Sequence, residues 1–117
     1  MATISAAVSQ VSGQAVVITW ASLTSATSDV GESVEMPYLS DRSVQAFGTF
    51  GTGGTCTLQG SNDGTNWATL EDSAGTGIAQ VVAGIKQIMP VTRYIRPNIT
   101  AGSGATITCV VYCTRSA

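Results

Sequence analysis

Apolar and polar residues alternate along most of this chain with a period of two, the spacing that separates the two faces of a β-strand. The pattern is clear at residues 14–21, where Val16, Ile18 and Trp20 point to one face. The opposite face carries mostly apolar residues as well, including Val17. We therefore expect this strand to be covered on both sides.

Further short strands are predicted along the rest of the chain, separated by turn-forming residues. Asn62, Asp63 and Gly64 tolerate positive φ values and predict the tip of a β-hairpin that returns at Trp67. Pro97 cannot donate a ladder hydrogen bond, so it marks its strand as an edge strand or marks the end of that strand. The predicted strands cover residues 14–21, 30–38, 42–50, 55–60, 66–70, 78–82, 85–89, 91–100 and 105–114. This pattern predicts an all-β fold, a single antiparallel β-sandwich of immunoglobulin-like or jelly-roll topology.

The pattern divides the chain into a short N-terminal arm, residues 1–13, and a β-sandwich domain, residues 14–117. The arm combines Ile4, Val8 and Val11 with Ala and Ser and has no clear period. Because so few apolar residues cannot form a core alone, we expect the arm to order only against a neighbouring subunit. Ile4, Val8 and Val11 are therefore candidate subunit contacts.

Composition points to a protein whose surface is partly covered. Charged residues make up only 10% of the chain, against a usual value of about 25%, and the mean hydropathy is +0.26. Apolar runs are too short for a membrane span or a signal peptide, which predicts a protein made in a cytoplasm. The net charge of −2 and the few scattered basic residues exclude a phosphate-tracking surface, so we expect no nucleic-acid binding.

Catalytic and metal-binding chemistry is not indicated. The chain has no His, so a Ser or Cys nucleophile lacks its usual base, and we expect a protein that is not an enzyme. Cys109 and Cys113 share one strand face roughly 13 Å apart at about 3.3 Å per residue, which is too far for a disulfide or a zinc site. We expect them and Cys56 to be buried thiols, although a bridge from Cys56 stays open if the strands are neighbours. No cofactor is predicted.

Four segments follow one another in a characteristic order along residues 44–112. They are Gly60-Ser61-Asn62-Asp63-Gly64-Thr65-Asn66-Trp67, Ala83-Gly84-Ile85-Lys86, Arg93-Tyr94-Ile95-Arg96-Pro97 and Gly102-Ser103-Gly104-Ala105-Thr106-Ile107-Thr108. In pattern and order they resemble small virion proteins of tailed bacteriophages, including proteins that decorate the capsid exterior. The resemblance implies a capsid decoration or cement protein on the exterior of the virion, made in the host cytoplasm, with the major capsid protein as its partner. It also implies a homo-oligomer, with a trimer suggested by analogy alone. It carries over no catalytic residue.

Two interpretations of the aromatic residues stay open. Tyr94 and Arg96 share a strand face, and a rigid aromatic beside a planar cation is typical of an interface, so both are candidate subunit contacts. The alternative is that Arg96 is a solubilising charge on an edge strand. In a carbohydrate-binding or adhesion module of a phage tail or fibre, Trp67 and Tyr94 would stack on sugars, whereas in a purely structural role Trp67 would be a core aromatic that locks the hairpin.

Overall fold

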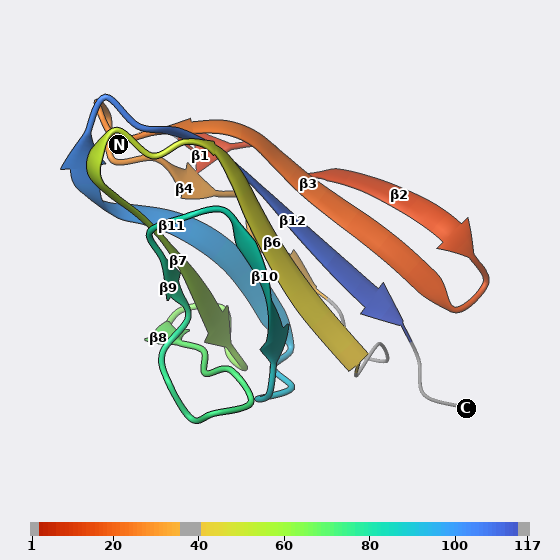
Figure 1. The fold of residues 1–117 in the computed structure, drawn as a ribbon. Helices are drawn as coiled ribbons and strands as arrows, with labels where there is room; N and C mark the ends of the chain where they lie inside the picture. Colours follow the sequence, from red (N-terminus) through yellow and green to blue (C-terminus); the bar gives the residue numbers. More distant parts are fainter. Residues whose placement is uncertain (1–2, 36–40, 115–117) are drawn as a thin grey trace.

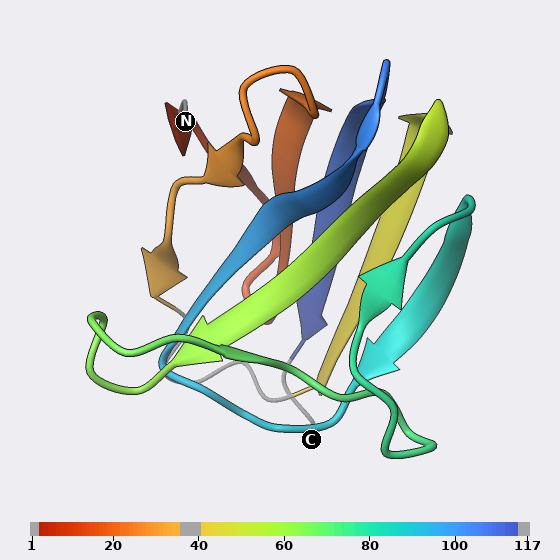
Figure 2. The same ribbon diagram turned by 90° about the vertical axis from the view of Figure 1, so that its left-hand side faces the viewer.

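The computed structural model describes residues 3–35 and 41–114, which form two β-sheets packed face to face (Figure 1). Within these ranges every regular element is a strand. Figure 2 shows the two layers, with β7 and β11 of one sheet crossing in front of the strands of the other. The predicted all-β sandwich is confirmed.

The first sheet has five strands in the order β10-β6-β12-β3-β2, all of them antiparallel. The last strand of the described chain, β12, is therefore the central strand of this sheet. The bounds are β2 Ala7–Ser12, β3 Ala15–Thr24, β6 Asp41–Thr49, β10 Gly84–Ile88 and β12 Thr106–Thr114.

The second sheet has seven strands and follows the path β1-β4-β11-β7-β8, with β5 also paired to β11 and β9 to β7. Its pairing is antiparallel except between β1 and β4, which run parallel. The bounds are β1 Thr3–Ile4, β4 Val30–Gly31, β5 Val34–Glu35, β7 Thr52–Ser61, β8 Ala68–Thr69, β9 Ala79–Gln80 and β11 Tyr94–Ser103.

The core lies between the sheets and is built from the inward positions of the alternating strands. Ile18 and Trp20 of β3 are fully buried, as the alternation predicts, and the Trp20 Nε1 donates to the carbonyl oxygen of Glu32 at 2.8 Å. Cys56, Cys109 and Cys113 are buried free thiols, as expected. The outward face of β3 meets no second layer formed by residues 3–35 or 41–114, and Val17 there is only half-buried. Within these ranges the cover expected on both sides of this strand is thus supplied on one side only.

The N-terminal segment is ordered by its own chain, which corrects the expectation that it orders only against a neighbouring subunit. Residues 3–4 pair with β4, and residues 7–12 pair with β3. The Ala6 N–H also donates to Glu32 Oε1 at 2.9 Å. Backbone pairing needs no apolar side chains, so a segment too polar to form a core still adds strands to an existing sheet.

Pro97 lies in the middle of β11, between β7 and the β4/β5 side, so the prediction of a strand edge or end is wrong. Pro97 pairs with Leu58 of β7, while on its other side β11 pairs with β4 at Asn98 and with β5 at Ile95. The missing N–H therefore lies near the break between β4 and β5. The Pro97 ring fits beside β4 because residue 31 is a glycine: a Cβ on Gly31 would lie 2.5 Å from the ring.

Other strands differ from the prediction in length. The predicted strands 66–70 and 78–82 shrink to β8 and β9, because the loop between them folds on itself through Asp72. Thr57 of β7 is buried, and its hydroxyl shares a 3.1 Å hydrogen bond with that of Thr100. Of the predicted strand 30–38, residues 30–31 and 34–35 are strands, and residues 36–38 lie outside the described ranges.

Candidate functional site

The hairpin between β7 and β8 is organised by one carboxylate. Asp63 Oδ1 accepts from the backbone N–H groups of Thr65 and Asn66 at 2.8 Å each and from the Ser61 hydroxyl at 2.9 Å. Its Oδ2 accepts from Asn66 Nδ2 at 2.7 Å. These donors, the Asn66 N–H first, hold the pKa of Asp63 well below its usual range. The predicted hairpin is confirmed, with a loop fixed tightly enough to set the position of Trp67.

Trp67 lies on the outer face of the seven-stranded sheet against β11. The guanidinium carbon of Arg96 lies 4.1 Å from the Trp67 ring centroid, which is a cation-π contact. Arg96 Nε also donates to Gln59 Oε1 at 2.9 Å, and partial burial lowers the pKa of Arg96. Trp67 is half-buried and outside the core cluster, so the interpretation of Trp67 as a core aromatic is wrong.

Tyr94, the first residue of β11, and Arg93 just before it extend this surface. Tyr94 packs beside the hairpin tip, because a Cβ on Gly64 would lie 3.3 Å from its ring. The Arg93 guanidinium lies 5.1 Å from the Tyr94 ring centroid and forms an ion pair with Glu35, which raises the pKa of Arg93. We call Gln59, Trp67, Arg93, Tyr94 and Arg96 the Trp67–Arg96 surface. It holds two cation-aromatic pairs on one rigid sheet face.

A cleft of about 360 Å³ adjoins this surface at the hairpin. Its lining combines the polar residues Asn62, Asn66 and Thr92 with apolar ones such as Leu70 and Pro90. Asn62 Oδ1 accepts from the Arg93 N–H at 3.1 Å, which ties the cleft wall to the Trp67–Arg96 surface. Amide and hydroxyl groups of this kind suit hydrogen bonding to a polar partner.

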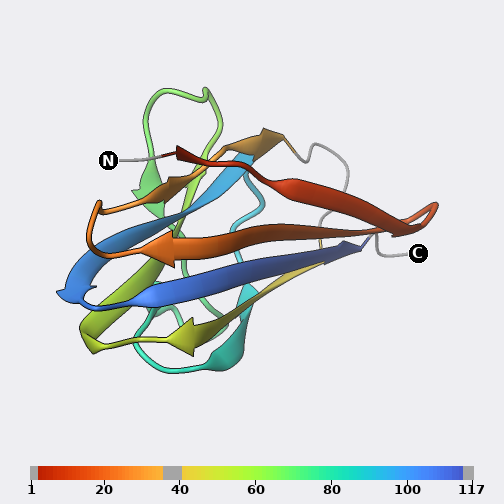
Figure 3. The same ribbon diagram turned by 90° about the horizontal axis from the view of Figure 1, so that it is seen from above.

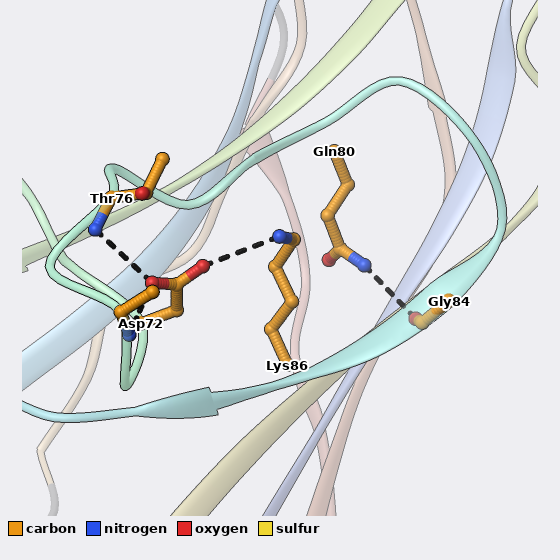
Figure 4. Close-up of polar contacts among 6 residues, drawn as sticks. Asp72, Thr76, Gln80, Gly84 and Lys86 are labelled. Carbon is orange, nitrogen blue, oxygen red and sulfur yellow. Dashed lines mark hydrogen bonds and ion pairs between the residues drawn. The ribbon is translucent and has the colours of Figure 1, made fainter.

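A second polar cluster joins the edges of the two sheets (Figure 4). Asp72, in the loop after β8, accepts from the N–H groups of Ala74 and Thr76 and pairs with Lys86 Nζ at 3.3 Å. These contacts, the Thr76 N–H first, lower the pKa of Asp72. Gln80 Nε2 donates to the carbonyl oxygen of Gly84 at 2.9 Å. Since these groups satisfy one another, the cluster is structural: it ties β10 to the seven-stranded sheet.

The five predicted contact residues fall into separate regions. Tyr94 and Arg96 lie together on the Trp67–Arg96 surface. Ile4 is half-buried and packs against the core, whereas Val8 and Val11 are exposed on β2 at the edge of the other sheet. The tip of the β2–β3 hairpin extends beyond the seven-stranded sheet (Figure 3).

The sequence did not indicate the roles of Gln59, Glu35 and Arg42, which bind Arg96, Arg93 and the Thr92 carbonyl oxygen, respectively. Gln59 is paired with Arg96 in the β7–β11 register, a pairing that the hairpin pattern alone does not reveal. Arg42 follows the alternation inward and is buried, donating from Nη1 to the Thr92 carbonyl oxygen at 2.9 Å, and burial lowers its pKa. Arg42 stands two and four residues before Val44 and Ala46, and this even spacing could have predicted that Arg42 points inward with them.

The described ranges hold no arrangement that indicates catalysis or metal binding. His, Cys, Asp and Glu side chains nowhere gather there in threes, as a metal site needs. The Cys109 thiol faces Cys56 across the core, and this contact, followed by burial, raises the pKa of Cys109 well above its ordinary value. Burial likewise raises the pKa of Cys113 to about 11, so neither thiol is activated as a nucleophile. Within the same ranges there is no helix of the length and apolar character that crossing a membrane requires.

Comparison with known proteins gives no relative: no family model, no curated protein and no solved structure matches this chain.

Proposed function

We propose that this chain is a non-enzymatic structural protein of a tailed-bacteriophage virion, a capsid decoration or cement protein that binds major capsid subunits on the exterior of the head. The proposal rests on the sequence resemblance for the class of protein and on the Trp67–Arg96 surface for the contact. Its synthesis in the host cytoplasm and its presence in many copies are part of the same proposal.

The observation that carries the contact is that Trp67, Tyr94 and Arg96 are held in place before any partner binds. Trp, Tyr and Arg are the residue types that contribute most to protein interfaces. Here each is fixed by neighbours: Arg96 by Gln59 and Trp67, and Tyr94 by the hairpin tip. Binding therefore costs little side-chain entropy, and repeated copies on a symmetric shell add their weak contacts by avidity.

The test is a binding assay with virus particles that lack the protein. The double variant Tyr94→Ala, Arg96→Ala should lose attachment while its circular dichroism spectrum stays that of the wild type. Val82→Ala, which shortens a side chain that is 68% exposed away from this surface, is the control and should attach normally. Wild-type attachment by a folded double variant would refute the assignment of this surface.

A carbohydrate-binding or adhesion module of a phage tail or fibre is the second candidate. It is favoured by one observation: Trp67 lies outside the core next to the cleft that Asn62, Asn66 and Thr92 help to line, and an aromatic platform with amide and hydroxyl groups suits a sugar. Glycan-array binding that disappears in a folded Trp67→Ala variant would support this candidate over the decoration protein. Absence of glycan binding by the wild type would count against it.

A further inference from the structure

The outer face of the five-stranded sheet carries no charged side chain across three rows of cross-strand neighbours. The register defines these rows, which we call the neutral face. They are Ser9-Val17-Tyr112-Ser43-Gln87, Ala7-Thr19-Val110-Gln45-Ile85 and Thr108-Phe47. Asp41, at the start of β6, lies at the border of this face.

Two features of the neutral face are unusual for a surface in contact with water. Exposed sheet faces of soluble domains ordinarily carry charged residues, and the other outer face of this protein does so with Arg96 and Glu35. The neutral face instead exposes large apolar side chains: Phe47 and Tyr112 are each 43% exposed and Ile85 is 67% exposed. This is also the side of β3 for which the alternation predicted a cover, and the described part of the chain supplies none there.

We infer that the neutral face packs against the neutral face of a second copy of this chain, related by a two-fold axis. A partner of different sequence is ordinarily selected by complementary charge, and this face offers none to be complemented. A face without charge is, however, complementary to itself, since an isologous contact sets no like charges against each other. The inference is independent of the function proposed above, which uses the opposite face of the sandwich.

The size of the face agrees with a reversible self-association contact. Three rows two residues apart span about 20 Å along the strands at about 3.3 Å per residue, and five strands about 4.8 Å apart span about 24 Å, which gives a footprint of roughly 400–500 Å². Side-chain relief raises the accessible area above this footprint, toward the ~800 Å² that each partner contributes to a stable interface. Two such sheets pack about 10 Å apart with their strands inclined by roughly 30°, so Val110, in the middle row on the central strand β12, would lie near the two-fold axis.

The test is sedimentation velocity of the full chain over a concentration series, up to about 100 μM. The wild type should sediment as a dimer. Gln45→Glu with Gln87→Glu keeps shape and adds charge at two exposed positions, and should raise the dimer dissociation constant at least about tenfold. Gln10→Glu is the matched control, because it makes the same change at an exposed position of the same sheet. Gln10 pairs with Val16 and therefore lies on the side of the sheet opposite the neutral face. This variant should leave the dimer intact.

A complementary pair of variants makes the assay specific for this face. The double Lys variant of Gln45 and Gln87 should also dissociate alone, and mixing it with the double Glu variant should restore a dimer containing one copy of each. A wild type that stays monomeric at the highest concentration, one that forms a trimer, or a dimer unaffected by the double variants would each overturn the inference. A monomer in solution that binds capsid surfaces through this face would identify a different occupant.

Discussion

Gly31 offers a sharp test of how the two sheets pack, because an alanine there would meet the core on two sides. Its Cβ would lie 2.5 and 2.6 Å from Cδ and Cγ of Pro97 and 2.6 Å from Cδ1 of Trp20. Real Cβ atoms do not approach so closely, and neither neighbour can yield: Trp20 is fully buried and the Pro97 ring is fixed within β11. The backbone φ of Gly31 is not in the left-handed region, so the expected effect is steric alone.

The cost of this methyl group can be estimated. Overpacking a rigid core costs about 1–3 kcal/mol, and three contacts below 3 Å place Gly31→Ala near the upper value. The smaller unfolded-state entropy of alanine returns about 0.4–1 kcal/mol. We therefore expect the free energy of unfolding to fall by about 2 kcal/mol, which lowers the melting temperature by roughly 8 °C in a domain of this size.

Urea denaturation followed by tryptophan fluorescence measures this change, with both proteins at one concentration so that self-association does not differ. Gly13→Ala is the control, because nothing lies within 4 Å of a Cβ at that position and its φ is likewise outside the left-handed region. It should be neutral or slightly stabilising. A Gly31→Ala variant as stable as the wild type to within about 0.5 kcal/mol would refute the packing of Pro97 and Trp20 around Gly31.

Three further changes have defined outcomes. The pKa of Asp63 is lower in the folded protein than the unfolded value of about 3.9. The stability that Asp63 contributes to the hairpin is therefore complete above about pH 4 and is lost as the pH falls below this toward the folded pKa. NMR signals of the loop amides that titrate with a midpoint near 4 would contradict this prediction. All three cysteines are buried and should react with a thiol reagent only after denaturation; rapid labelling of the native protein would show that a thiol is accessible. Cys109→Ser should lower the free energy of unfolding in urea by about 1–3 kcal/mol, since it buries a hydroxyl among apolar groups. Deleting residues 1–9 should lower the melting temperature by several degrees, because it removes β1, part of β2 and the half-buried Ile4. An unchanged melting temperature would mean that the pairing of β1 with β4 and of β2 with β3 adds nothing to stability.

The period-two pattern predicted the strands that have one buried face. In β3, β6 and β12 the inward residues are those that the alternation selected, because burial against a core imposes the period directly. The hairpin at Asp63 was predictable for a similar reason, since the turn chemistry is local. Features that depend on neighbours far along the chain were not predictable in this way.

Pro97 and Trp67 show why features that depend on distant parts of the chain were not predictable. The sequence around Pro97 does not reveal that the strand beside it breaks where the N–H is missing, so a general rule for proline gave the wrong place. Trp67 lies outside the core, where the guanidinium of Arg96 stacks on its ring and is itself held by Gln59. Arg96 and Gln59 belong to strands whose pairing follows from the whole topology. The neutral face was equally hidden, since its rows bring together residues from five separate segments.

The order of strands has a consequence for how the protein reaches its folded state. β11 and β12 come last along the described chain, yet each lies between strands made much earlier: β12 between β3 and β6, and β11 between β7 and the β4/β5 pair. A nascent chain that ends before residue 94 therefore holds the two halves of each sheet without the strand that joins them. We expect cooperative folding to begin only after synthesis passes β12, at the millisecond-to-second rates of chains dominated by distant contacts. Removal of β12 should leave no folded core at all, because both of its neighbours would lose their shared partner.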